Sequence, residues 1–134
     1  MLATVDRDVA LLRPSLGRLP DPVARPALVV VSGLPGTGKS TFSRQLALRV
    51  PLAIVESDAL RQVLSPNPAH SAEESSRLFA AIHRLIEQLL EEGVPTLLDA
   101  TNLQERHRER LYHIAGRLRV KLILVWVEAP QGVV

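Results

Sequence analysis

Apolar positions in this chain gather into four short unbroken runs, each followed by polar residues and then by a segment with helical spacing. The runs lie at 28–31, 52–55, 96–98 and 122–127. Continuous apolar runs of this length are typical of strands that are buried on both faces of a parallel sheet. The repeated order of strand, loop and helix therefore predicts an α/β fold with a mainly parallel sheet and right-handed crossovers.

The clearest predicted helix begins at a capping box, because Ser71 and Glu74 have the S-x-x-E spacing. Apolar residues then recur at helical intervals up to Gly93, which predicts the C-terminal stop. His83 and Arg84 fall outside the main apolar stripe, so we expect both side chains to be solvated.

Three further helices are predicted after the other strands. The first covers 39–49, and the second covers 59–64 with Ser57 or Asp58 as its N-cap. Thr101 and Asn102 each have a Gln or Glu three residues later, so they are alternative starts of the third helix. On that helix His107 shares the apolar stripe, and packing at the helix end is favoured over a catalytic role.

Residues 1–26 form a different kind of segment. Thr4 is placed to cap two helical turns that end at Leu12, and four prolines between positions 14 and 26 then predict irregular backbone. We expect 1–26 to be a Pro-rich arm that links or packs, and 27–134 to be a single core.

Composition limits the class of protein. The chain has 134 residues, of which 46% are hydrophobic and 3% aromatic, so it suits one domain with an aliphatic core. It contains no cysteine, and its net charge of +2 is too small to indicate a nucleic-acid partner. Its apolar runs are shorter than a membrane span, and its first residues lack the signal-peptide pattern. We therefore expect a cytoplasmic protein that has no membrane partner.

A glycine-rich loop joins the first strand to the helix at 39–49. Gly33, Gly38, Lys39 and Ser40 match the pattern G-x-x-x-x-G-K-[ST] of a phosphate-binding loop, or P-loop. In such a loop backbone N–H groups surround an anion, the lysine reaches the β- and γ-phosphates of ATP, and the serine hydroxyl holds Mg²⁺. A glycine turn with a solvated lysine is the weaker alternative, because a strand precedes the loop and a helix follows it. The predicted ATP-binding residues are Gly33, Leu34, Pro35, Gly36, Thr37, Gly38, Lys39, Ser40 and Thr41.

Two more polar clusters follow the second and third strands, at the sheet edge where α/β folds bind ligands. Asp58 is placed to orient an acceptor hydroxyl or to accept its proton, and a capping role is compatible with this. Asp99 is suited to hold Mg²⁺ through water or to orient the acceptor, and a structural capping role is the alternative. Arg61 is placed to bind an anionic substrate group, although it could equally be an ordinary surface arginine.

Three motifs, G-L-P-G-T-G-K-S-T, S-D-x-L-R and L-D-A-T-N-L, occur in this order within residues 27–130. In them the chain resembles the P-loop kinases related to polynucleotide 5′-hydroxyl kinases and zeta-toxin-like kinases, a group that includes bacterial predicted kinases and AAA-type ATP-binding proteins. The resemblance implies a three-layer α/β/α sandwich with sheet order 2-3-1-4-5, here 2-3-1-4. It also implies binding of ATP and Mg²⁺ and transfer of the γ-phosphate to a hydroxyl.

The same resemblance assigns roles by motif. Asp58 corresponds to the family's general base, and Asp99 to the first residue of its D-x-T-N segment. Together with the arguments from the residues above, the catalytic candidates are Lys39, Asp58 and Asp99, and the metal-site candidates are Ser40 and Asp99, Asp99 acting through water. The substrate-binding residues that it implies are Asp58, Arg61, Thr101, Asn102 and Arg108.

Two functions from different classes stay open. The family places an arginine-bearing lid and a fifth strand after the fourth strand, and this sequence ends at Val134, where the lid would begin. One function is a kinase acting on a hydroxyl of a small molecule, a nucleotide or a polynucleotide 5′ end; few aromatic residues are present to stack on bases, so nucleic acid is not favoured. The other is a nucleotide-binding module or truncated kinase core without independent activity.

The strand at 122–127 lies at an edge in the expected sheet order. A long apolar edge strand tends to pair with other chains. We therefore expect this edge to be covered by a second copy in a homodimer, by another partner, or by the Pro-rich arm.

Overall fold

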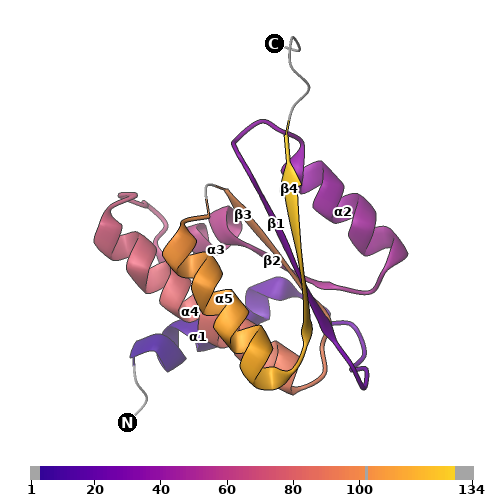
Figure 1. Cartoon of the computed structure of the whole chain (residues 1–134). Helices are drawn as coiled ribbons and strands as arrows, with labels where there is room; N and C mark the ends of the chain where they lie inside the picture. The colour runs from indigo at the N-terminus through magenta and orange to yellow at the C-terminus, as the bar shows by residue number, and fades with distance from the viewer. Residues whose placement is uncertain (1–3, 102, 129–134) are drawn as a thin grey trace.

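A computed structural model describes residues 4–101 and 103–128 of the chain. The elements in chain order are α1 (Thr4–Leu12), the 3₁₀-helix η1 (Arg13–Leu16), β1 (Ala27–Gly33), α2 (Lys39–Arg49), β2 (Ala53–Glu56), α3 (Ser57–Leu64), α4 (Ala72–Glu91), β3 (Thr96–Thr101), α5 (Glu105–Leu118) and β4 (Lys121–Val127) (Figure 1). Every predicted strand and helix is present. Within the described ranges, no helix combines the length and the apolar character that a membrane span requires.

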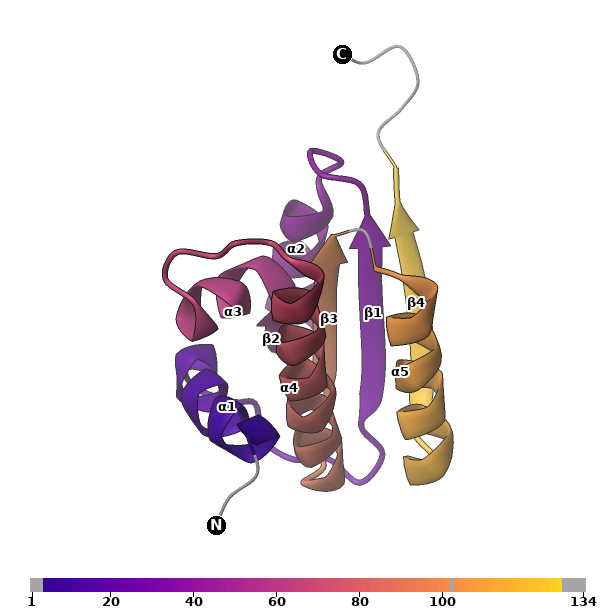
Figure 2. The ribbon, with the colours of Figure 1, turned by 90° about the vertical axis from the view of Figure 1, so that its left-hand side faces the viewer.

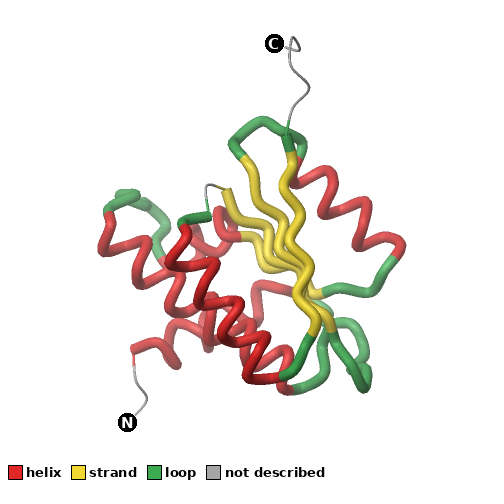
Figure 3. Tube along the Cα trace, viewed as in Figure 1, coloured by secondary structure: helices red, strands yellow, loops and turns green. Residues whose placement is uncertain are grey.

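The strands form one parallel sheet in the order β2-β3-β1-β4, which confirms the expected order (Figure 3). In this sheet Asp99 of β3 is paired with Val31 of β1 on one side and with Glu56 of β2 on the other. Because all four strands run in the same direction, the loops that follow β1, β2 and β3 meet at one edge. The candidate site residues lie at the ends of these strands or in the segments that follow them.

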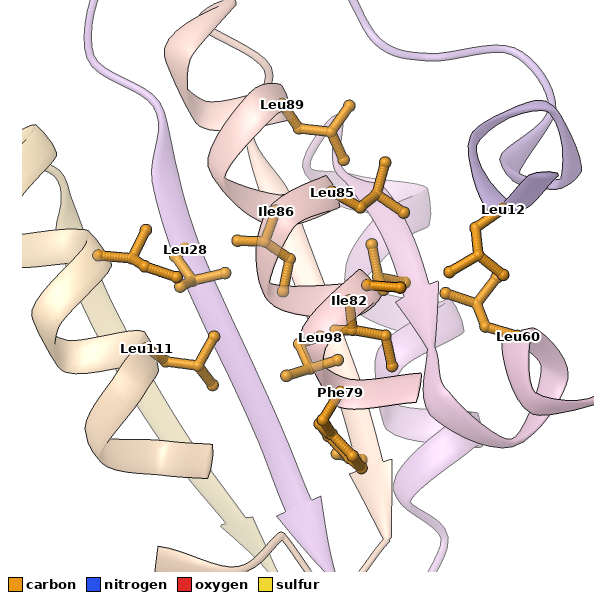
Figure 4. Packing of buried hydrophobic residues seen from close by; sticks show 14 of the residues in the cluster. Leu12, Leu28, Leu60, Phe79, Ile82, Leu85, Ile86, Leu89, Leu98 and Leu111 are labelled. Carbon is orange, nitrogen blue, oxygen red and sulfur yellow. The ribbon is translucent and has the colours of Figure 1, made fainter. Parts of the chain in front are cut away.

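The sheet lies between two unequal layers of helices, as the three-layer prediction requires. Helix α2 covers one face alone, whereas α4 and α5 cover the other face, with α1 and α3 beside them (Figures 1 and 2). The main core lies on the face of α4 and α5. There Ile82, Leu85, Ile86 and Leu89 of α4 are fully buried against the strands (Figure 4).

The start and the stop of α4 confirm the predicted signals. Ser71 is the N-cap, and its Oγ accepts a hydrogen bond of 3.1 Å from the backbone N–H of Glu74. After the helix Gly93 adopts a φ of +84°, a conformation that L residues with a Cβ rarely take. The prediction that His83 is solvated is wrong, since only 8% of this residue is exposed. It is buried because α5 packs beside α4, which the apolar stripe of α4 alone does not reveal.

Two other helix starts differ from the prediction. Helix α3 already includes Ser57 and Asp58, and its N-cap Glu56 makes no side-chain cap bond. Helix α5 begins at Glu105, whereas Thr101 belongs to β3. In both places the strand extends further than its apolar run, so the polar residues that resembled caps are absorbed into the neighbouring elements. Asn102, the other predicted start, lies outside the described residues.

The N-terminal arm packs on the face of α4 and α5. Asp8 of α1 is buried and accepts two hydrogen bonds from Arg77 of α4, at 2.9 and 2.8 Å. Further along, Arg13 makes a bidentate ion pair with Glu92, at 2.7 and 2.6 Å. The expected irregular backbone is interrupted by η1, which contains Pro14 near its start, where the missing N–H costs nothing.

The edge of β4 is not covered by this arm, so that alternative is wrong. Helix α1 lies on the opposite side of α4 from α5 and β4 (Figure 2). Ile123, Leu124 and Trp126 of β4 are 39%, 44% and 53% exposed. Coverage of this edge by a second copy or by another partner stays a prediction.

Candidate active site

The loop between β1 and α2 has the backbone conformation that its glycines predict. Gly36 and Gly38 have φ values of +77° and +89°, in the region where side chains cause strain. Gly33 is needed for a different reason: a Cβ at this position would lie 2.5 Å from the carbonyl oxygen of Val127 in β4. The last strand therefore fixes the first residue of the loop, which restricts that residue to glycine.

This loop encloses a cavity of about 190 Å³ at the start of α2. The N-cap of α2 is Gly38, which has no side chain, so the helix has no side-chain cap. The first backbone N–H groups of an uncapped helix form a site for an anion, assisted by the helix dipole. The cavity is lined by six of the nine residues that the sequence assigns to ATP binding, Leu34, Gly36, Gly38, Lys39, Ser40 and Thr41. Of the remaining three predicted residues, Gly33, Pro35 and Thr37, the last donates a hydrogen bond from its hydroxyl to the carbonyl oxygen of Leu34 at 2.8 Å.

Lys39 and Asp99 form a buried ion pair at the base of this loop. The Nζ atom of Lys39 donates to Oδ1 of Asp99 at 2.6 Å, and the two side chains are only 9% and 1% exposed. Burying two charges is unfavourable unless each has a close partner of opposite charge. The pair brings two residues predicted to be catalytic into direct contact, although they are 60 positions apart in the sequence.

The residues near this ion pair fit a magnesium ion. The second carboxylate oxygen of Asp99, Oδ2, is buried and has no hydrogen-bond partner among the described residues. Ser40 is half-buried in the first turn of α2. Within the described residues, no group of three or more metal-binding side chains is present. Mg²⁺ suits such a site, because it is usually held by one or two protein oxygens together with phosphates and water.

Asp58 and Thr101 meet at the same edge of the sheet. The hydroxyl of Thr101 donates a long hydrogen bond of 3.4 Å to Oδ2 of Asp58, which is exposed in the first turn of α3. This contact joins the end of β3 to the start of α3. Asp58 is therefore exposed to solvent, and this long hydrogen bond holds it only weakly.

Arg61 points toward the start of α4. Its Nη1 atom donates to Oε1 of Glu74 at 2.9 Å and to Oγ of Ser75 at 3.3 Å. Burial would raise the pKa of Glu74, but the hydrogen bonds from Arg61 and from two backbone N–H groups outweigh it and lower that pKa. Arg61 therefore joins α3 to α4, and it lines a separate cavity of about 300 Å³ in which Asp58 has no part.

The other predicted substrate residues are placed as follows. Arg108 is half-buried in the first turns of α5, and its side chain makes no hydrogen bond or ion pair with the rest of the described chain. Asn102 lies outside the described residues. The structure therefore brings Lys39 to Asp99 and Asp58 to Thr101, and it leaves Arg108 unengaged.

Glu56 is a carboxylate to which the sequence analysis assigned no role. It is half-buried at the end of β2 and is the register partner of Asp99 on the neighbouring strand. Both residues are two positions after an apolar residue that packs on the α2 face, Ile54 and Leu97 respectively, so both face α2. Only the register of β2 and β3 places Glu56 beside Asp99, and a single sequence does not provide this register.

A parallel sheet with a P-loop after its first strand and acidic residues at the ends of the next two strands defines a P-loop nucleotide-binding protein. The comparison with family models agrees with this class. A model described as an AAA domain matches residues 28–134, which include the P-loop and all the site residues discussed. The chain belongs to this family.

Curated relatives of the chain are kinases for different acceptors. The adenylyl-sulfate kinase of Paraburkholderia xenovorans is 27% identical over 115 residues, which make up 82% of this chain and 63% of that kinase. The shikimate kinase of Corynebacterium glutamicum is 33% identical over 108 residues, or 77% of this chain and 59% of that kinase. The chain thus spans about three fifths of the length of each.

Solved structures share the fold. The APS kinase CysC of Mycobacterium tuberculosis, in complex with AMPPNP and APS, superposes with a TM-score of 0.61 at 22% identity, covering 83% of this chain and 66% of that chain. A chain of the Pnkp1/Rnl/Hen1 RNA repair complex gives a TM-score of 0.67 at 22% identity, covering 82% of this chain and 35% of that chain. At these identities the likeness establishes the fold alone.

Proposed function

We propose that this chain is the catalytic core of an ATP-dependent kinase that transfers the γ-phosphate to a hydroxyl group. The observation that carries the proposal is the buried contact between Lys39 of the P-loop and Asp99 of β3, beside the exposed carboxylate of Asp58. The kinase names of the curated relatives support the same reaction type. Their acceptors differ, so they do not identify the acceptor of this chain.

The residues of the site divide the work of phosphoryl transfer. Backbone N–H groups of the P-loop and of the first turn of α2 bind the phosphates of ATP. The ammonium group of Lys39 neutralises phosphate charge, and Asp99 holds that ammonium group ready before ATP binds. When bound, Mg²⁺ would be held by Ser40 and, through water, by Asp99, and it would supply further positive charge.

Asp58 is the proposed general base. Its carboxylate is exposed at the sheet edge, where it can accept the proton of an acceptor hydroxyl as the oxygen attacks the γ-phosphate. Thr101 orients this carboxylate through their hydrogen bond. Arg108 is proposed to contact the acceptor, because its guanidinium group has no partner within the described chain. Arg61 is proposed to do so only where the acceptor displaces Glu74, with which Arg61 is paired.

The acceptor is proposed to be a small molecule or a nucleotide in preference to a polynucleotide. Of the four aromatic residues, Phe79 is buried and stacks on His107, with ring centroids 4.2 Å apart. The three exposed ones, Phe42, Tyr112 and Trp126, come from three different elements, α2, α5 and β4. A cytoplasmic location belongs to the same proposal, because ATP is abundant there and a chain without cysteine needs no oxidising compartment.

A label-transfer experiment tests this function. The chain is incubated with γ-labelled ATP and Mg²⁺ and offered a panel of small hydroxyl metabolites, nucleosides and 5′-hydroxyl oligonucleotides. We expect label to move to one acceptor class and to be lost in Asp58→Asn, while Arg49→Gln, an exposed arginine at the end of α2, serves as the control. Transfer that is indifferent to Asp58 would contradict the assigned base. Lys39-dependent ATP binding without any transfer would favour the nucleotide-binding module instead.

A further inference from the structure

A third cavity lies between α4 and α5, on the face of the sheet opposite the P-loop helix. Its volume is about 490 Å³, within the range of small-ligand sites. Three arginines line it, Arg84 from α4 and Arg106 and Arg110 from α5, together with His83, His107 and Val5 of α1. No residue of the P-loop or of the proposed acceptor site takes part in it.

The positive charge of this cavity is only partly neutralised. Glu87 is the one carboxylate that lines it, and Glu87 pairs with both Arg84 and Arg117. Arg84 has a second acidic neighbour, Asp6, at 3.7 Å. Among the described residues Arg106 has only a neutral side-chain partner, since its Nε atom donates to Oε1 of Gln104 at 3.0 Å.

The side chain of Arg110 makes no hydrogen bond or ion pair within the described residues, and Arg110 stands one helical turn after Arg106 on α5. Residues four positions apart on a helix are neighbours on its surface. Two guanidinium groups that lack an acidic partner in the described chain therefore line the same cavity from the same helix.

Two buried histidines also line this cavity. Burial, then the neighbouring His107 and Arg110, lower the pKa of His83 to about 4. Burial and then Arg106 lower the pKa of His107. Both rings are therefore neutral at pH 7, and the rings are fixed: His107 stacks on Phe79, and Nε2 of His83 lies 3.2 Å from the carbonyl oxygen of His107. Since that carbonyl can only accept, Nε2 of His83 is the donor.

We propose that this cavity is a second ligand site, which binds the phosphate group of a small phosphate monoester between Arg106 and Arg110. A guanidinium group can donate two parallel hydrogen bonds to two oxygens of one phosphate, so it recognises phosphate more selectively than a simple point charge does. The neutral imidazole rings and Val5 provide a rigid, mostly apolar wall for the organic part of the ligand. The site is separate from the P-loop, so it does not depend on the proposed kinase activity.

Imidazole signals of His83 and His107 in NMR spectra at pH 7 test the proposal directly. Inorganic phosphate and glucose 6-phosphate are titrated in separate arms, with sodium chloride at matched ionic strength as the reference. We expect saturable shifts of both histidines in the two phosphate arms, with tighter binding of the ester. Arg110→Gln and Arg106→Gln should each weaken the affinity about tenfold, which corresponds to 1.4 kcal/mol.

The matched control is Arg49→Gln, which removes an exposed arginine from α2 and should leave both titrations unchanged. Because the signals belong to His83 and His107, phosphate bound at the P-loop does not mimic the response. Shifts of equal size in sodium chloride, or shifts that persist in the Arg106→Gln and Arg110→Gln double variant, would overturn the proposal. The proposal would also be overturned if neither inorganic phosphate nor glucose 6-phosphate shifted the signals of the two histidines.

Discussion

The two faces of the sheet are built on different principles. On the face of α4 and α5, aliphatic side chains such as Leu85 and Leu111 are fully buried, and they form one large cluster that reaches α1 and α3. On the face of α2, the buried cluster contains only Val29, Val31 and Leu97. The only buried residues of α2 itself are Lys39 and Ser43.

This difference separates stability from chemistry. A charged pair such as Lys39 and Asp99 would be costly among the aliphatic side chains of the larger core. Beneath α2 the pair stands at the edge of a thin apolar layer and opens toward the P-loop cavity. The face of α4 and α5, the thick face, buries most of the core, and the face of α2, the thin face, holds Lys39 and Asp99, which are proposed to act on the phosphates of ATP.

The largest expected difference between the faces is in their response to truncated leucines. Leu85→Ala removes a fully buried side chain of α4 and should lower the free energy of unfolding by about 4 kcal/mol. Leu46→Ala on α2 removes a half-buried side chain and should cost about 1 kcal/mol. Urea unfolding of both variants measures the contrast. Equal losses would show that the two faces contribute alike.

The ion pair of the thin face should be the next largest contributor. Lys39→Met leaves the buried Asp99 without its partner and should cost about 3 kcal/mol of stability. Lys121→Met, the same substitution at an exposed lysine of β4, is the control and should cost almost nothing. In a double-mutant cycle with Asp99→Asn, the combined loss should be smaller than the sum of the single losses. Additive losses would mean that the two side chains do not interact.

Lowering the pH should reduce the free energy of unfolding through His83, which is buried on the face of α4 and α5. The pKa of His83 is depressed to about 4 in the folded chain, chiefly by burial and then by His107, against about 6.5 when unfolded. Between these values the unfolded chain binds the additional proton, so stability falls as the pH falls, by up to about 3 kcal/mol at pH 4. Denaturant unfolding between pH 7 and 4 measures this. His83→Gln should flatten that part of the profile, whereas the same change at the exposed His113 should not.

The smallest expected effect concerns the contact between Thr101 and Asp58. Because this hydrogen bond is long and exposed, Thr101→Val should change the free energy of unfolding by less than about 1 kcal/mol. Its effect should appear in catalysis, as a lower kcat with little change in the KM for ATP. Thr41→Val, at an exposed threonine of the P-loop helix, should show the opposite pattern, with its main effect on the KM for ATP. Identical kinetic profiles would remove the proposed positioning role of Thr101.

The sequence predicts the local features of both faces, and it misses the features that depend on how the elements pack. Apolar periodicity locates α4 and its burial, and the glycine pattern locates the P-loop, because both signals are local. The burial of His83 and the pairing of Arg61 with Glu74 depend on which helices are neighbours, and this is decided by packing. Strand register places Glu56 beside Asp99, and it too is invisible in a single sequence.

Binding of a nucleotide by the chain itself tests the central claim most directly. Calorimetric titration with AMPPNP in the presence of Mg²⁺ is compared for the wild type, Lys39→Met and Lys121→Met. We predict binding to the wild type and to Lys121→Met, and at least about a hundredfold loss in Lys39→Met, as expected when a buried charge that contacts phosphate is removed. Equal binding by all three proteins, or no binding by the wild type, would contradict the assignment of the thin face as a nucleotide site.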